Sequence, residues 1–119
     1  MKNLLETVSA IGIVPVIRID DPADTIPLAK ALYHNGLPIA EITFRSSHAK
    51  AAIEAIHNEL PDMLLGAGTV LTIEQVDDAI VAGAEFIVTP GFNPEIVSYC
   101  IKNKINIIPG CSNASDIEK

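Results

Sequence analysis

The segment PIAEITFR, residues 38–45, joins an apolar run to three polar side chains at alternate positions. The run predicts a β-strand, and because side chains alternate along a strand, Glu41, Thr43 and Arg45 point to one face. Strands of a buried parallel sheet are normally apolar on both faces. A carboxylate and a guanidinium on one face therefore indicate one of two arrangements. Either this is a half-exposed edge strand with an ordinary ion pair, or the face opens onto a solvated cavity.

Outside this segment, short apolar runs alternate with amphipathic segments. We expect strands over residues 13–17, 38–44, 64–67, 85–88 and 106–108, and helices over 4–10, 21–35, 49–59, 72–83, 93–103 and from 113 onward. Ser46 or Ser47 is expected to cap the third helix, and Thr72 opens a capping box with Gln75 at the fourth. One helix after each strand, with short connections, predicts a parallel sheet with right-handed crossovers.

Two α/β architectures have such a sheet: an open doubly wound sheet and a parallel (β/α)8 TIM barrel. No Gly-x-Gly-x-x-Gly follows the first expected strand, which argues against dinucleotide binding. Polar or special residues recur where successive strands end, at Arg18, 41–45, Thr69, 89–91 and 109–111. Chemistry that converges from many strand ends is typical of a barrel mouth. Because such barrels need roughly 200 residues or more, we expect residues 1–119 to be the N-terminal part of one barrel domain, with about the first five βα units.

Composition excludes several classes of partner. The net charge is −7, and Arg18 and Arg45 are the only arginines, so a nucleic-acid or anionic membrane surface is not expected. The N-terminal residues do not resemble a signal peptide, and no apolar run is long enough to span a bilayer, so we expect a cytoplasmic protein. The two cysteines and three histidines show no ligand spacing, so we expect no metal site.

Six segments, in order along nearly the whole chain, resemble the KHG/KDPG aldolases. These class I aldolases cleave 2-dehydro-3-deoxy-6-phosphogluconate to pyruvate and glyceraldehyde 3-phosphate, or 4-hydroxy-2-oxoglutarate to pyruvate and glyoxylate. The segments are VPVIR (14–18), PLAKAL (27–32), EITFR (41–45), GAGTV (66–70), GAEFIVTPG (83–91) and IPG (108–110). Each is weak alone, but the ordered set is specific.

The resemblance implies a role for five residues. Glu41 matches the glutamate that transfers protons, and Arg45 matches the arginine that binds the carboxylate of the pyruvyl unit. Thr69 matches a threonine whose hydroxyl lies near the same carboxylate, Pro90 lines the pocket, and Arg18 matches an arginine at the end of the first strand. A guanidinium suits the substrate carboxylate because its planar fork binds two oxygens at once.

The resemblance also implies a lysine that forms a Schiff base with the substrate ketone, on the sixth strand in a Lys-Phe-Phe-Pro type motif. This chain has no such motif, and its lysines are expected on helices or at the N-terminal ends of strands. They are Lys2, Lys30, Lys50, Lys102, Lys104 and Lys119. We therefore expect the proton-transfer and carboxylate-binding half of a site, without its nucleophile. The resemblance implies no cofactor, a small anionic keto-acid or phosphosugar substrate, and a homo-oligomer, commonly a trimer.

Two alternatives remain open. The first is a non-catalytic half-barrel that pairs with another chain, or a phosphosugar-binding module without turnover, because five open strands expose edges and an apolar inner face. The second is a phosphosugar isomerase or epimerase barrel, in which Glu41 would act as the base.

Overall fold

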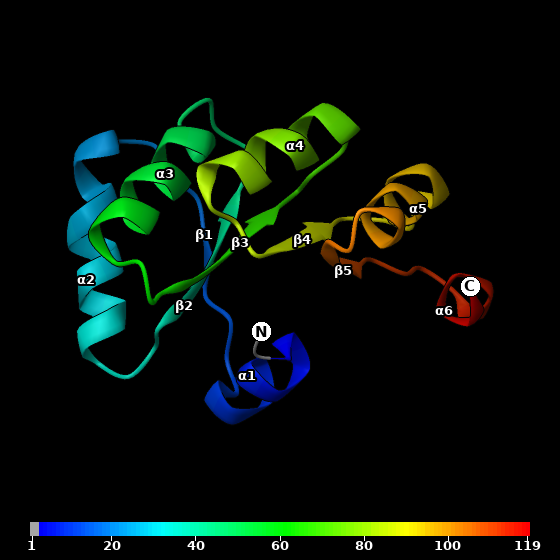
Figure 1. Ribbon diagram of the computed structural model, residues 1–119, viewed down its shortest axis with the longest axis horizontal. Helices are drawn as coiled ribbons and strands as arrows, with labels where there is room; N and C mark the ends of the chain where they lie inside the picture. Colours follow the sequence, from blue (N-terminus) through cyan, green and yellow to red (C-terminus); the bar gives the residue numbers. More distant parts are fainter. Residues whose placement is uncertain (1–2) are drawn as a thin grey trace.

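The computed structural model describes residues 3–119, which form one five-stranded parallel sheet (Figure 1). The strands are β1 (Val16–Ile17), β2 (Ile39–Thr43), β3 (Leu64–Gly68), β4 (Phe86–Thr89) and β5 (Asn106–Pro109). They pair in chain order, β1-β2-β3-β4-β5. A doubly wound sheet reverses its strand order at a switch point. Uninterrupted order with a helix in each connection is instead the arrangement of a (β/α)8 barrel, and the predicted five βα units are confirmed.

One helix, α1, precedes the sheet, and each strand is followed by a helix. The helices are α1 (Leu4–Ile11), α2 (Thr25–His34), α3 (Ala49–Glu59), α4 (Ile73–Ala82), α5 (Pro94–Lys102) and α6 (Ala114–Glu118), and a 3-10 turn (Pro22–Asp24) precedes α2. Thr72 caps α4 as predicted, since its hydroxyl accepts from the Gln75 amide at 3.1 Å. The capping box is incomplete, because the Gln75 side chain accepts from the Leu71 amide at 2.8 Å and not from the Thr72 amide. Over residues 3–119, no helix is long and apolar enough to cross a membrane.

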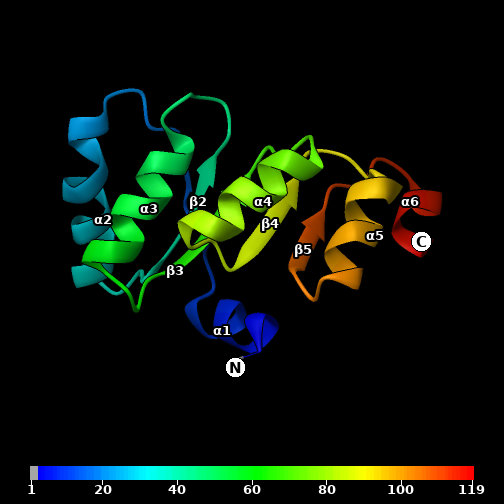
Figure 2. The same ribbon diagram turned by 45° about the horizontal axis from the view of Figure 1, so that its top comes forward.

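Helices α2 to α5 cover one face of the sheet, and α1 lies apart from them, beside the N-terminal ends of the strands (Figures 1 and 2). The main core fills the space between the sheet and these four helices. It is built from apolar side chains that point outward from the strands and inward from the helices. Its fully buried members include Ile42, Leu65, Ala67, Ile87, Ile53, Val76, Ala79 and Cys100. The inner face of the sheet is therefore the face that carries the unusual residues of the sequence.

Two local predictions were wrong. The first strand, expected over 13–17, is only two residues long, because Pro15 has no N–H to donate to a sheet ladder; its carbonyl still accepts from the Glu41 amide at 2.9 Å. Neither Ser46 nor Ser47 caps α3, whose N-cap residue His48 makes no side-chain capping bond. The Ser46 hydroxyl accepts from the His48 amide at 3.1 Å, just before α3, and donates to the distant Ile19 carbonyl.

Candidate functional site

Glu41 lies on the inner face of the sheet, away from α2 to α5. Its neighbour Ile42 is fully buried in the helix-facing core, and the alternation of β2 directs Glu41 to the opposite side. Strand β2 lies between β1 and β3 and is not an edge. Within residues 3–119, no ion pair joins Glu41 to Arg45. The edge strand with an ordinary ion pair is therefore wrong, and the polar face of β2 lies on the side of the sheet away from α2 to α5 (Figure 1).

The Glu41 side chain rests on the backbone of β3. At Gly68 a Cβ would overlap the Glu41 carboxylate oxygen Oε1 and would lie 2.7 Å from its Cδ. Burial raises the pKa of the Glu41 carboxyl above its ordinary value, and the positive charge of Arg45 acts in the opposite direction. A carboxyl with a raised pKa binds and releases a proton closer to neutral pH than an exposed one, which suits proton transfer.

Arg45 and Thr69 meet where β2 and β3 end. The Arg45 Nε donates to the Thr69 hydroxyl at 3.3 Å. Thr69 adopts a left-handed backbone with φ 55°, which is uncommon for a residue other than glycine and costs of order 1–3 kcal/mol. Such strain persists only where the surroundings impose it. This turn presents the Thr69 hydroxyl to the exposed guanidinium of Arg45.

Two hydroxyls tie the end of β2 to the end of β1. The buried Thr43 hydroxyl donates to the Ile17 carbonyl at 3.2 Å, and the Ser46 hydroxyl donates to the Ile19 carbonyl at 2.6 Å. These bonds bracket Arg45 on both sides in sequence. They therefore hold the segment between Glu41 and α3 against β1, so that Arg45 extends from a fixed backbone.

Arg18 is exposed and takes a different partner from the rest of the site. Its Nε donates to the Asp20 carboxylate at 2.7 Å, with 57% of the Arg18 side chain accessible. The charge that lowers the Glu41 pKa comes from Arg45. In this structure Arg18 is thus neutralised locally, beside the group formed by Glu41, Arg45 and Thr69.

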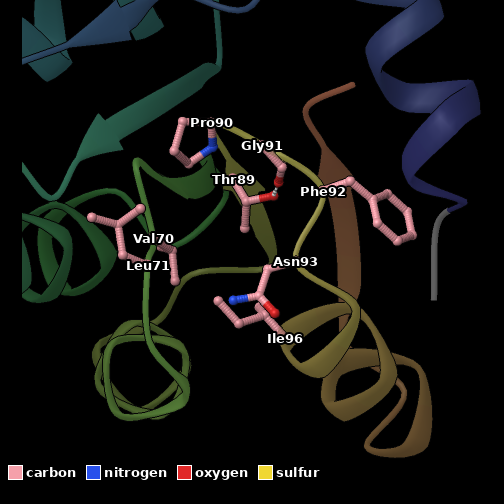
Figure 3. Close-up of a pocket in the computed structure, with 8 residues that line it drawn as sticks. All are labelled: Val70, Leu71, Thr89, Pro90, Gly91, Phe92, Asn93 and Ile96. Atoms are coloured by element: carbon pink, nitrogen blue, oxygen red, sulfur yellow. Dashed lines mark hydrogen bonds between the residues drawn. The ribbon is translucent and has the colours of Figure 1, made fainter. Parts of the chain in front are cut away.

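Pro90 lies at the rim of a separate hollow (Figure 3). This hollow has a volume of about 190 Å³ and lies between the loops that follow β3 and β4. Its lining consists of Val70, Leu71, Thr89, Pro90, Gly91, Phe92, Asn93 and Ile96. Val70 and Ile96 belong to the core between the sheet and the helices, so the hollow lies on the helix side. The lining does not include Glu41, which lies on the opposite face of the sheet.

The described lysines lie away from the inner face. Lys30 pairs with Glu59 at 2.6 Å and Lys50 with Asp78 at 2.5 Å, both on the outer helices. Lys102 ends α5, and Lys104 lies in the turn before β5. Lys119 follows α6, with its Nζ 5.6 Å from the centre of the Phe92 ring. Lys2 lies outside the described residues. Over residues 3–119, no group of three or more His, Cys, Asp or Glu side chains could hold a metal ion.

The structure thus brings Glu41, Arg45 and Thr69 together. Arg18 pairs with Asp20 and Pro90 lines another hollow, so neither contacts this group. Sequence reasoning missed Gly68, which makes room for the Glu41 side chain. The available signal was a glycine inside a strand, which often marks the close approach of another group.

Comparison with known proteins identifies the family of this chain. The sequence profile described as "KDPG and KHG aldolase" matches residues 4–119. The chain belongs to the KDPG and KHG aldolase family. A 2-dehydro-3-deoxy-phosphogluconate aldolase of Treponema pallidum is 44% identical over 119 residues, which are 100% of this chain and 57% of that protein. A 2-dehydro-3-deoxy-phosphogluconate aldolase of Haemophilus influenzae is 48% identical over 117 residues, 98% of this chain and 55% of that protein.

Solved aldolase structures match the fold of this family member. The 2-keto-3-deoxy-6-phospho-gluconate aldolase of Zymomonas mobilis has a TM-score of 0.85 at 36% identity, covering 93% of this chain and 55% of its own. The KDPG aldolase of Legionella pneumophila, solved with pyruvate captured as a covalent carbinolamine intermediate, has a TM-score of 0.84 at 40% identity. That match covers 88% of this chain and 51% of the Legionella chain. The chain therefore spans about half the length of the relatives that it matches.

Proposed function

We propose that this chain supplies the proton-transfer and carboxylate-binding half of a class I aldolase. The substrate would be 2-dehydro-3-deoxy-6-phosphogluconate, 4-hydroxy-2-oxoglutarate, or both. The observation that carries the proposal is the Glu41 carboxyl, held on the inner face with a raised pKa and with Arg45 and Thr69 nearby. Family membership supports an aldolase over the isomerase or epimerase alternative.

The proposed reaction needs a lysine in addition to the residues of this chain, because none of its described lysines lies at the site. Once a lysine has formed a Schiff base with the C2 ketone, cleavage of the C3–C4 bond requires removal of the C4 hydroxyl proton. The resulting enamine must then be protonated. Glu41 would serve both steps, as base and then as acid. Arg45 would bind the substrate carboxylate through its guanidinium fork, and the Thr69 hydroxyl would orient that fork.

A chimera tests the proposal. This chain would be joined to the C-terminal portion of the Haemophilus influenzae relative, the portion that lies beyond the matched region. Cleavage of 2-dehydro-3-deoxy-6-phosphogluconate is measured by coupling pyruvate to lactate dehydrogenase. We expect activity from the chimera and a loss of at least about 100-fold in its Glu41→Gln variant, the usual scale for a general acid–base group. A folded chimera without activity, or an active Glu41→Gln variant, contradicts the proposal.

The 119-residue chain on its own gives a second test. We propose that it forms no covalent adduct with pyruvate on treatment with borohydride, because its described lysines lie on the outer helices or before strands. Mass spectrometry after borohydride treatment checks this. An adduct formed at the rate of a full-length relative would show that a nucleophile is present after all.

We also propose that the chain associates with another polypeptide, which is either a second copy of itself in a cytoplasmic homo-oligomer or a different chain. The support is the inner face at the two sheet edges, where Val16 of β1 is 65% exposed and Ile108 of β5 is 43% exposed. Exposed apolar side chains beside unpaired strand edges favour association. Sedimentation velocity checks this, since a stable monomer over a wide concentration range would contradict it.

A further inference from the structure

Gly68 lacks a side chain at the place where the Glu41 side chain lies. A Cβ at Gly68 would overlap the Glu41 Oε1 and would lie 2.7 Å from Cδ and 2.9 Å from Cγ. Three consecutive groups of the Glu41 side chain would thus meet one added carbon. The Glu41 side chain therefore crosses from β2 and lies flat against β3, with the Gly68 backbone as its support.

Backbone conformation does not explain this glycine. The glycines with a left-handed φ are Gly12, Gly36 and Gly83, and Gly68 is not one of them. It pairs in register with Thr43, within a regular parallel ladder. An alanine could adopt the same extended conformation, so space for a neighbouring side chain is the reason that remains.

We infer that Gly68 is a positioning residue, whose missing side chain fixes the Glu41 carboxylate against β3 at the depth from which it transfers protons. The inference rests on the proposed function only in assigning proton transfer to Glu41. A methyl group at this position displaces the carboxylate from β3 toward the open side of the inner face. The other inner-face glycine of β3, Gly66, has a different neighbour, since its Cβ would meet the Phe86 ring.

The groups around Glu41 decide what this displacement does to its titration. On β1 its register partner is the apolar Val16, and on β3 its neighbours are Gly66 and Gly68. The charge that acts on it is that of Arg45, two residues beyond the end of β2, and this charge taken alone would lower the Glu41 pKa. Burial acts more strongly and raises that pKa. Moving the carboxylate into solvent removes the stronger effect, so the pKa of Glu41 falls.

The test uses the 119-residue chain labelled with ¹³C at the glutamate side chains. The pH titration of the Glu41 Cδ resonance, assigned with Glu41→Gln, is followed in the original chain, in Gly68→Ala and in the control Gly91→Ala. The control adds the same methyl group at a site where a Cβ meets nothing within 4 Å. We expect the Glu41 midpoint to move to lower pH in Gly68→Ala and to stay unchanged in Gly91→Ala. An unchanged midpoint in Gly68→Ala overturns the inference.

A double variant covers the case in which Gly68→Ala fails to fold. Glu41→Ala removes the atoms that the new methyl group would meet, so Glu41→Ala/Gly68→Ala should fold, as judged by circular dichroism. If Glu41→Ala folds and the double variant does not, the clash is not with Glu41 and the inference is wrong. None of these measurements uses catalysis. An inactive chimera would therefore refute the proposed function and leave the role of Gly68 standing, and an unchanged titration would do the reverse.

Discussion

The contact between Gly66 and Phe86 predicts a strong energetic coupling across the inner face of the sheet. Phe86 is fully buried, and a Cβ at Gly66 would overlap two atoms of its ring and lie 2.6 Å from a third, Cδ2. Phe86→Ala should cost about 3–5 kcal/mol of unfolding free energy through lost burial and the cavity that it leaves. Gly66→Ala should cost about 1–3 kcal/mol, because the added methyl group forces the ring to move.

The double variant separates this contact from general damage. In the Phe86→Ala background the methyl group of Gly66→Ala meets no ring. There Gly66→Ala should stabilise the protein by about 0.4–1 kcal/mol, because alanine lowers the conformational entropy of the unfolded chain. The two substitutions should therefore be non-additive by about 2 kcal/mol, within the range found for residues in contact.

Urea unfolding followed by circular dichroism measures all four proteins. Gly91→Ala combined with Phe86→Ala is the matched control, because a Cβ at Gly91 meets nothing within 4 Å, and these two changes should add. If Gly66→Ala and Phe86→Ala add to within about 0.5 kcal/mol, the scatter expected for independent sites, the ring does not pack on Gly66 and the reasoning is refuted.

Two further predictions concern titration and reactivity. The hydrogen bond from the Tyr99 hydroxyl to Asp77, 2.6 Å long, raises the pKa of Tyr99, and the stability it adds is present below that pKa and lost as pH rises through it. The pH titration of Tyr99 can be followed by phenolate absorbance in a Tyr33→Phe background. The substitution Asp77→Asn should lower the Tyr99 pKa, and an unchanged pKa would show that the hydrogen bond to Asp77 is absent. Cys111 is exposed, whereas Cys100 is buried and burial raises its pKa. An aromatic disulfide reagent should therefore modify one thiol in the native protein and the second only in denaturant, and equal rates would show that the α5 core is open.

The features that could be predicted from sequence are those set by residues close together in the chain. Helix α3 runs over Ala49–Glu59 as expected, because an apolar stripe of helical period needs no distant partner. Thr72 caps α4 because its acceptor and the amide lie three residues apart. Ser46 has the same chemistry, but it donates to the Ile19 carbonyl 27 residues away, and local spacing does not reveal that bond.

The candidate site divides in the same way. Strand periodicity placed Glu41 and Arg45 on one face, and the family resemblance added Thr69, whose hydroxyl does accept from Arg45. The direction of the Arg18 side chain depends on the nearby Asp20, which offers it a closer partner than the inner face does. The role of Gly68 depends on a side chain 27 positions earlier in the chain, and a glycine alone does not say which neighbour it makes room for.

Strand β3 explains why the inner face holds both an apolar core and a polar site. Its outward residues Leu65 and Ala67 are fully buried against the helices, whereas two of its three inward positions, Gly66 and Gly68, are glycine. Such a strand offers bare backbone to its two neighbours. The Phe86 ring from β4 occupies one glycine, and the Glu41 side chain from β2 occupies the other. The carboxylate therefore rests on the central strand of the sheet, which is paired on both sides. Since paired, buried strands are the last parts of a fold to open, Glu41 is supported by one of the least mobile elements of the chain.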